Sequence, residues 1–167
     1  MRRKVKVDWE ELIIAFEASG FDQSNYLDLE TGEVVSLMRE IMDSDEIDEI
    51  EQRVNSEPER YKFIPSIDSS EAYDDMVKFI DTVEDKHLAE LLSVAINGKG
   101  AFRRFKDVLL SYPVERERWF EFQSDLMVRR VEEWLQEIGI EPSSKRPRRH
   151  ISRGDMDHDK RNLPPLV

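Results

Sequence analysis

The eleven residues from Asn97 to Asp107 carry the residue types best suited to binding an anionic ligand or partner. They contain two glycines, two phenylalanines and four basic side chains, in the order NGKGAFRRFKD. A glycine-rich turn before a helix can present backbone N–H groups to a phosphate. The Gly-x-x-x-x-Gly-Lys-Ser/Thr spacing of a nucleotide-binding loop is missing, however, and the stretch follows a predicted helix rather than a strand. We therefore expect no nucleotide-binding fold here.

The segment Lys99–Asp107 also begins with Lys-Gly, as the aromatic octamer of RNA-recognition strands does. Its phenylalanines stand at the fourth and seventh places, whereas the octamer has its aromatics at the fifth and eighth. A spacing of three is helical and places both rings on one side. The predicted inner face is Ala101, Phe102, Phe105 and Leu109, and the predicted outward side chains are Arg103, Arg104 and Lys106, with Lys99 at the start. Two interpretations remain open: a structural corner between helices, or a corner that also contacts a ligand or partner.

Further arginines lie on the predicted last helix and can join this surface if that helix packs back antiparallel. They are Arg116, Arg118, Arg129 and Arg130. Arginines interleaved with Trp119 and Phe120 suit either stacked bases or an acidic protein partner. Neighbouring glutamates neutralise them locally, and a pI of about 4.8 is unusual for a nucleic-acid-binding domain. We predict a contact surface made of Lys99, Arg103, Arg104, Lys106, Arg116 and Arg118.

Acidic residues are abundant but do not form a recognisable metal site. Six of the nine residues from Asp43 to Glu51 are acidic, yet a calcium loop would need a glycine at its sixth position and a glutamate at its twelfth. We interpret this segment as the solvated face of an amphipathic helix. The charges near the predicted hairpin turn (Asp28, Glu30 and Glu33) are likewise expected to be solvated. The segment Asp155–Asp159 has metal-binding residue types without an ordered frame.

Catalytic patterns are also missing from the sequence. The three histidines are His87, in an exposed first helical turn, and His150 and His158, in the predicted tail. None has a nucleophile or a paired carboxylate at a spacing that indicates catalysis. We expect no catalytic residue, no metal and no cofactor.

Charge is distributed unevenly along the 167 residues, whose formal net charge is −12. Residues 8–98 contain six Lys or Arg against twenty-five Asp or Glu, residues 99–140 eight against eight, and residues 141–167 seven against four. The acidic part should repel nucleic acid and anionic membranes. No apolar run approaches the roughly 20 residues of a membrane span, the basic start is followed by acidic residues unlike a signal peptide, and cysteine is missing. We expect a cytoplasmic protein without membrane contact.

Apolar spacing and turn residues predict the secondary structure that must position these side chains. Asp8 and Glu11 form a capping box for a helix ending at Gly20. Segments 25–29 and 33–37, joined through Gly32, predict a β-hairpin, and residues 61–64 predict a third strand. Later helices are expected after Asp43, after Ser69 or Ser70, after Asp85, at Lys99–Asp107 and over the long segment 114–138. Their expected inward side chains include Tyr73, Met76, Val77, Ile80, Leu88, Leu91, Leu92 and Ala95.

Together these elements predict an α+β fold: a small antiparallel sheet covered by about five or six helices, with a long C-terminal helix. We expect residues 1–7 to be a basic arm or short edge strand and residues 8–140 to form a single domain. Residues 141–167 are polar, contain proline and lack periodicity, so a disordered basic tail is expected. The sequence does not determine the oligomeric state.

The chain resembles the bacterial uncharacterised protein family 0158. The matching residues are Tyr26–Val34, Ile64-Pro65 with Met76 and Phe79, Gly98–Asp107, Trp119, and Trp134-Leu135. The resemblance covers residues 8–140 and implies a bacterial, cytosolic protein. The family has no established activity, so no residue role can be transferred to these positions.

The prediction from the sequence is thus a non-enzymatic binding or regulatory module that contacts a protein partner through an exposed basic surface. The alternative is a nucleic-acid-associated protein that uses the same surface together with the basic tail.

Overall fold

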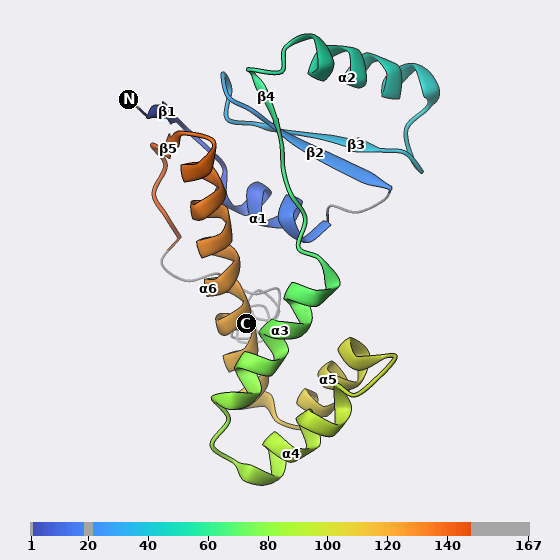
Figure 1. The fold of residues 1–167 in the computed structure, drawn as a ribbon, viewed down its shortest axis with the longest axis vertical. Coiled ribbons are helices and arrows are strands. Elements are labelled where there is room, and N and C mark those ends of the chain that lie inside the picture. Colours follow the sequence, from blue (N-terminus) through green and yellow to red (C-terminus); the bar gives the residue numbers. More distant parts are fainter. Residues whose placement is uncertain (1, 19–21, 148–167) are drawn as a thin grey trace, which may run out of the picture. The chain divides into compact units, whose positions relative to one another are not determined.

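The computed structural model describes residues 2–18 and 22–147, which form two compact units (Figure 1). Residues 2–18, 22–67 and 127–147 belong to the first unit, and residues 68–126 belong to the second. The helix α6 (Pro113–Glu137) contributes to both. An α+β fold is confirmed, with six helices in the described part of the chain, a small antiparallel sheet and a long C-terminal helix. The single domain over residues 8–140 stays a prediction, because compact units can unfold together or separately.

The first unit is built around a three-stranded antiparallel sheet. Its elements are β1 (Arg3–Val5), α1 (Trp9–Ala18), β2 (Gln23–Asp28), β3 (Val34–Met38), α2 (Ser44–Ser56), β4 (Tyr61–Phe63) and β5 (Ile140–Pro142), joined by the second half of α6. The strand order is β3-β2-β4, so the predicted hairpin and third strand are both confirmed. Asp43 caps α2 in a full capping box, and Asp8 accepts a hydrogen bond from the Glu11 N–H at the start of α1. The expected helix end at Gly20 lies outside the described residues.

The hairpin turn depends on Gly32. Its φ of 77° is in the left-handed region, and its N–H donates to the Asp28 carbonyl at 2.7 Å. A side chain here would place its Cβ only 1.9 Å from the Lys6 carbonyl oxygen. Gly32 therefore has two reasons to be glycine: the turn conformation, and the close approach of the chain that follows β1.

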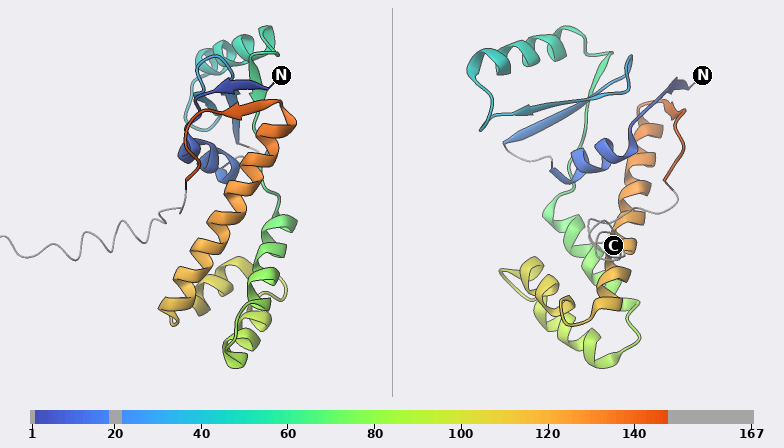
Figure 2. Two further views of the ribbon diagram at one scale, coloured as in Figure 1. Left: turned by 90° about the vertical axis from the view of Figure 1, so that its left-hand side faces the viewer. Right: turned by 180° about the vertical axis from the view of Figure 1, so that it is seen from behind.

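The sheet lies between α1 and α2 (Figures 1 and 2). Leu27 points to one face and Leu37 to the other, and both are fully buried. The larger core joins α1, β2 and the second half of α6, where Phe16 meets Trp134 edge-on at a centroid distance of 5.7 Å. By contrast, Val54 is the buried residue of α2. The prediction that α2 is mainly a solvated acidic helix is consistent with this burial.

The parallel pair β1–β5 joins the two ends of the described chain, and the sequence did not predict it. Arg3 pairs with Ile140, and Val5 pairs with Pro142. Beyond the strands, the Ser143 N–H donates to the Val5 carbonyl at 2.9 Å. The Trp9 indole N–H also donates to the Ser144 carbonyl. Residues 141–147 of the expected tail are therefore part of the first unit, and residues 148–167 lie outside the described residues.

The second unit consists of α3 (Ser69–Asp81), α4 (Lys86–Ala95), α5 (Ala101–Leu109) and the first half of α6. Its core is aromatic. Phe105 and Trp119 meet edge-on at 4.8 Å, and Phe79 and Trp119 at 5.3 Å. Asp85 caps α4 as predicted, whereas α3 is capped by Asp68 and not by Ser69 or Ser70. None of the helices within the described ranges is long and apolar enough to span a membrane.

Three side chains predicted to be inward are exposed, because each lies at the margin of its helix's apolar face. Phe102 is 41% exposed, Leu91 38% and Val77 38%. On α5 the inner face is centred on Phe105, with Ala101 and Leu109 four residues to either side. On α4 it is formed by Leu88, Leu92 and Ala95, and on α3 by Asp75, Met76 and Phe79. The predicted inward orientation of these three side chains was wrong.

Candidate partner-binding site

Arg104 closes the corner between α4 and α5. Its Nε donates to the Ala95 carbonyl at 2.8 Å, and its two terminal nitrogens donate to the carbonyls of Asn97 and Lys99. Ala95 is the last residue of α4, where carbonyls lack helical partners and the helix dipole favours a cation. Arg104 is half-buried, and its guanidinium caps this helix, a structural role that the sequence did not predict.

The glycines of the corner make this cap possible. Gly98 and Gly100 both have a φ of 79°, which reverses the chain between the two helices. A Cβ at Gly100 would meet an Arg104 guanidinium nitrogen at 3.0 Å, whereas a Cβ at Gly98 would meet nothing within 4 Å. The structural interpretation of this stretch as a helix corner therefore accounts for its glycines, for Phe105 and for Arg104.

Arg118 performs a similar task at the end of α3. Its guanidinium donates to the Thr82 hydroxyl at 2.6 Å and to the Thr82 carbonyl at 3.3 Å. Thr82 is the C-cap of α3, and its hydroxyl donates in turn to the Phe79 carbonyl. The guanidinium also lies over the Phe79 ring at 5.1 Å and 3.5 Å from the Glu115 carboxylate. Arg118 thus joins α6 to α3 and has a sufficient structural role.

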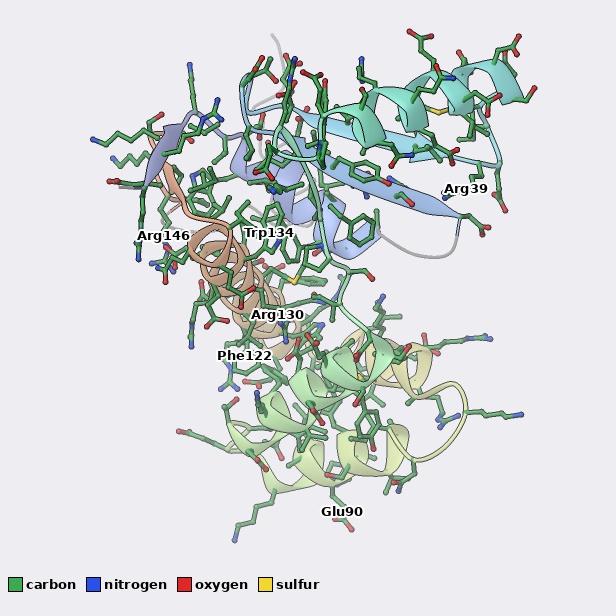
Figure 3. The ribbon with its side chains drawn as sticks, turned by 45° about the horizontal axis from the view of Figure 1, so that its top comes forward. Arg39, Glu90, Phe122, Arg130, Trp134 and Arg146 are labelled. Atoms are coloured by element: carbon green, nitrogen blue, oxygen red, sulfur yellow. The ribbon has the colours of Figure 1, made fainter. Side chains whose placement is uncertain are left out.

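The other predicted arginines of α6 are divided between the units. Arg116 is exposed in the second unit, with its guanidinium 5.2 Å from the Phe120 ring centroid. Arg129 and Arg130 belong to the first unit (Arg130 is labelled in Figure 3), and Arg130 donates to the Met127 sulfur at 3.7 Å. Their clustering with the basic residues of α5 stays a prediction.

Lys99, Arg103 and Lys106 remain exposed, together with two apolar side chains. We define the α5 outer face as Lys99, Phe102, Arg103, Lys106 and Leu110. The spacing of Phe102, Lys106 and Leu110 is four residues, and Arg103 lies beside them on the same side of the helix. The side chain of Arg103 is 88% exposed, and its contact with Asp107 at 3.9 Å is a surface pair of little energetic weight. Within the described ranges, neither lysine of this face forms an ion pair.

An ionic cluster around Arg60 was not predicted from the sequence. Arg60 holds Asp28 in a bidentate pair, with both N···O distances 2.9 Å, and also lies 3.1 Å from Glu30 and 3.7 Å from Glu57. Asp28 is 5% exposed, so the expectation that it stays solvated is wrong. The pair joins the hairpin turn to the loop before β4 across 32 residues of sequence. The sequence held no local signal for this pair, because alternation with the apolar Leu27 and Leu29 predicts that Asp28 faces solvent.

This pair has a clear electrostatic signature. The hydrogen bonds from Arg60 lower the pKa of Asp28 from its ordinary value of 3.8 to about 2, and the Glu30 N–H contributes in the same direction. The same pair raises the pKa of Arg60 above its ordinary value. A carboxylate that stays ionised and held by an arginine is suited to structural work rather than to proton transfer.

No catalytic arrangement emerges from the described residues. No group of three or more His, Asp or Glu side chains in that part of the chain is placed to hold a metal ion. His87 is exposed in the first turn of α4, as predicted. His150, His158 and the segment Asp155–Asp159 lie outside the described residues. The α5 outer face is therefore the candidate surface that geometry supports best, because its cations are exposed and could contact an anionic group.

Comparison with known proteins assigns the chain to a family. A model of the uncharacterised protein family UPF0158 matches residues 2–157, beyond the 8–140 expected from the resemblance. The chain is 28% identical over 143 residues to UPF0158 protein PA5073 of Pseudomonas aeruginosa, covering 86% of this chain and 90% of that protein. It is 26% identical over 125 residues to a UPF0158 protein of Chlamydia trachomatis, covering 74% of this chain but only 38% of that longer protein. No solved structure matches significantly. Because the family model covers nearly the whole sequence, this chain belongs to the uncharacterised protein family UPF0158.

Proposed function

We propose that this protein is a non-enzymatic binding or regulatory module of the bacterial cytoplasm, whose α5 outer face contacts an acidic segment of a partner protein. The proposal depends on a difference among the basic residues of the second unit: some bind backbone carbonyls and others are exposed. Arg104 and Arg118 are held by backbone carbonyls, whereas Lys99, Arg103 and Lys106 have no comparable structural partners among residues 2–18 and 22–147.

The mixture of side chains on this face favours a protein partner. Arginine and aromatic residues are enriched in protein interfaces, and Phe102 and Leu110 supply apolar area beside the cations. A partner helix or strand with alternating acidic and apolar residues would complement both kinds of side chain. Complementary charge mainly speeds encounter and selects the partner, while the apolar contacts slow dissociation.

A matched pair of charge-reversal variants tests the proposal. Lys99→Glu/Lys106→Glu alters the α5 outer face, and Lys78→Glu/Lys86→Glu makes the same change in net charge at exposed positions of α3 and α4. Each full-length protein is immobilised and used to capture cytosolic proteins, which are identified by mass spectrometry. We expect the first variant to lose a specific acidic partner and the second to retain it, with both melting temperatures within about 3 °C of wild type.

The outcome can contradict the proposal in two ways. Equal capture by wild type and by Lys99→Glu/Lys106→Glu would exclude the α5 outer face as the contact surface. Equal loss in both variants would show that capture follows net charge alone. Phe102→Ser provides an independent check, because it removes apolar area without changing charge and should accelerate dissociation of the same partner.

A further inference from the structure

The β1–β5 pair brings together two basic segments that are almost the length of the chain apart. Arg2, Arg3, Lys4 and Lys6 precede α1, and Lys145 and Arg146 follow β5. Pairing of Lys4 with Glu141 and of Val5 with Pro142 aligns the two segments in parallel, and Ser143 and Ser144 extend their contact to Val5 and Val7. The two basic segments, distant in sequence, are therefore adjacent in the fold, where β1 lies beside β5 (Figures 1 and 2).

In residues 2–7, apolar side chains alternate with cationic ones, so the two kinds point to opposite sides of the extended chain. Val5 and Val7 are buried at 5% and 3%, while Lys4 and Lys6 are exposed. Because side chains alternate across an extended chain, Arg2, Lys4 and Lys6 lie on the side opposite the core. We define the terminal ribbon as Arg2, Lys4, Lys6, Glu141 and Lys145. Arg146 is excluded because it pairs with Glu132 of α6 at 2.7 Å (Figure 3).

We propose that the terminal ribbon binds the phosphate backbone of a nucleic acid, independently of base sequence. Cations on one side of an extended chain stand about 6.6 Å apart, which is close to twice the roughly 3.4 Å axial spacing of phosphates along one strand of a duplex. A straight row of cations at that interval suits a linear polyanion. The ribbon presents no aromatic side chain for stacking and no base-reading element, so the contact is with the backbone.

Other anionic partners fit this surface less well. Val5, Val7 and Ile140 are buried, so the described residues of these two segments present no exposed apolar side chain to insert among lipids. A few lysines alone supply only about 1 kcal/mol each at an anionic membrane surface. The α5 outer face differs, because there the cations are accompanied by Phe102 and Leu110. The ribbon is thus a separate surface with different chemistry from the proposed partner-binding face.

The acidic remainder of the protein sets the strength of this contact. A net charge of −12 opposes approach of a polyanion, but salt screens this repulsion beyond about 8 Å at physiological ionic strength. Contacts at the ribbon are shorter than that distance. Glu141 is the strand-register partner of Lys4 and the one carboxylate in the terminal ribbon, so it weakens the attraction between Lys4 and a phosphate. Binding should therefore be weak and strongly dependent on salt.

Salt dependence gives the quantitative test, using the full-length chain and a short fluorescein-labelled DNA duplex followed by anisotropy. Four cations predict a slope of about −3.6 in log affinity against log salt, or roughly a 150-fold loss between 50 and 200 mM. Lys4→Gln/Lys6→Gln should reduce the slope to about −1.8. Lys99→Gln/Lys106→Gln removes the same charge from the α5 outer face and should leave the slope unchanged.

Glu141→Gln is expected to strengthen binding, so its effect cannot be explained by unfolding of the variant. It should tighten binding about threefold at low salt, because it removes the carboxylate beside Lys4. Three results would overturn the proposal: no binding by wild type at 50 mM salt, equal weakening in the two lysine variants, or loss of binding only in Arg148→Gln/Arg149→Gln. Binding to anionic phospholipid vesicles without binding to the duplex would replace the nucleic acid by a membrane. None of these results affects the test of the α5 outer face.

Discussion

Replacing Asp28 by Asn tests the main ionic contact of the first unit. The carboxylate is bound bidentately by Arg60, and the pKa of Asp28 falls from 3.8 to about 2. At about 1.4 kcal/mol per pKa unit, this shift corresponds to about 2 kcal/mol of folding free energy at pH 7. Arg60 keeps Glu30 and Glu57 as partners in the variant, so the loss should stay below the roughly 3–5 kcal/mol of a fully orphaned buried charge.

The pH dependence has a definite sign. The pKa of Asp28 is lower in the folded protein than in the unfolded chain, so its stabilising effect is complete above the unfolded value of 3.8. The effect is lost as the pH falls through the folded value of about 2. At pH 3 about half of it should remain, or about 1 kcal/mol. The difference in unfolding free energy between wild type and Asp28→Asn should therefore shrink from pH 7 to pH 3.

Urea denaturation followed by circular dichroism measures these differences, since guanidinium would screen the charges. Glu30→Gln is the matched control, because it removes another carboxylate from the same arginine at a position 56% exposed. This control should cost no more than about 0.5 kcal/mol. Equal losses of stability in the two variants at pH 7, or a loss in Asp28→Asn that is the same at pH 3 as at pH 7, would contradict a stabilising ion pair between Asp28 and Arg60.

Two further comparisons test the glycines and arginines of the turns. Gly32→Ala should destabilise the protein by more than about 2 kcal/mol, because its Cβ would lie 1.9 Å from the Lys6 carbonyl oxygen, whereas Gly98→Ala at a similar φ but in open space should cost about 1 kcal/mol. If urea denaturation gave equal losses of unfolding free energy for Gly32→Ala and Gly98→Ala, the backbone at Lys6 would have moved to accommodate the new Cβ. Arg104→Met should lower the free energy of unfolding by about 2 kcal/mol or more, because the hydrogen bonds to its carbonyl partners are lost. Arg103→Met should change it by no more than about 0.5 kcal/mol. A thermal melt in which the two arginine variants coincide would contradict the assignment of Arg104 as a helix cap.

Local sequence signals were sufficient for most of the elements. Asp85 caps α4 as predicted, Asp8 accepts a hydrogen bond from the Glu11 N–H at the predicted start of α1, and Gly32 takes the positive φ that the hairpin turn requires. These features depend on contacts within a few residues, so their physical cause is visible in a short window. The phenylalanine spacing in α5 also predicts correctly that Phe105 is buried. The same spacing failed for Phe102, since the width of an apolar face depends on how neighbouring helices pack against it.

The roles of the charged side chains could not be predicted from the sequence. The sequence shows that Arg103 and Arg104 are adjacent cations but does not distinguish their roles. Only Arg104 reaches back to the carbonyls that end α4. Likewise, the charge of Asp28 is visible in the sequence, but its partner Arg60 is 32 residues away. The β1–β5 pair joins segments separated by nearly the whole chain.

The sequence by itself therefore determined the helices, the hairpin and the uneven distribution of charge, since periodicity and capping act locally. Only the tertiary structure decided which cations cap helices or form ion pairs. It also decided which cations remain exposed on the α5 outer face and which lie on the terminal ribbon. The physical reason is that a charged side chain acquires its role from the groups that surround it after folding, and those groups come from distant parts of the chain.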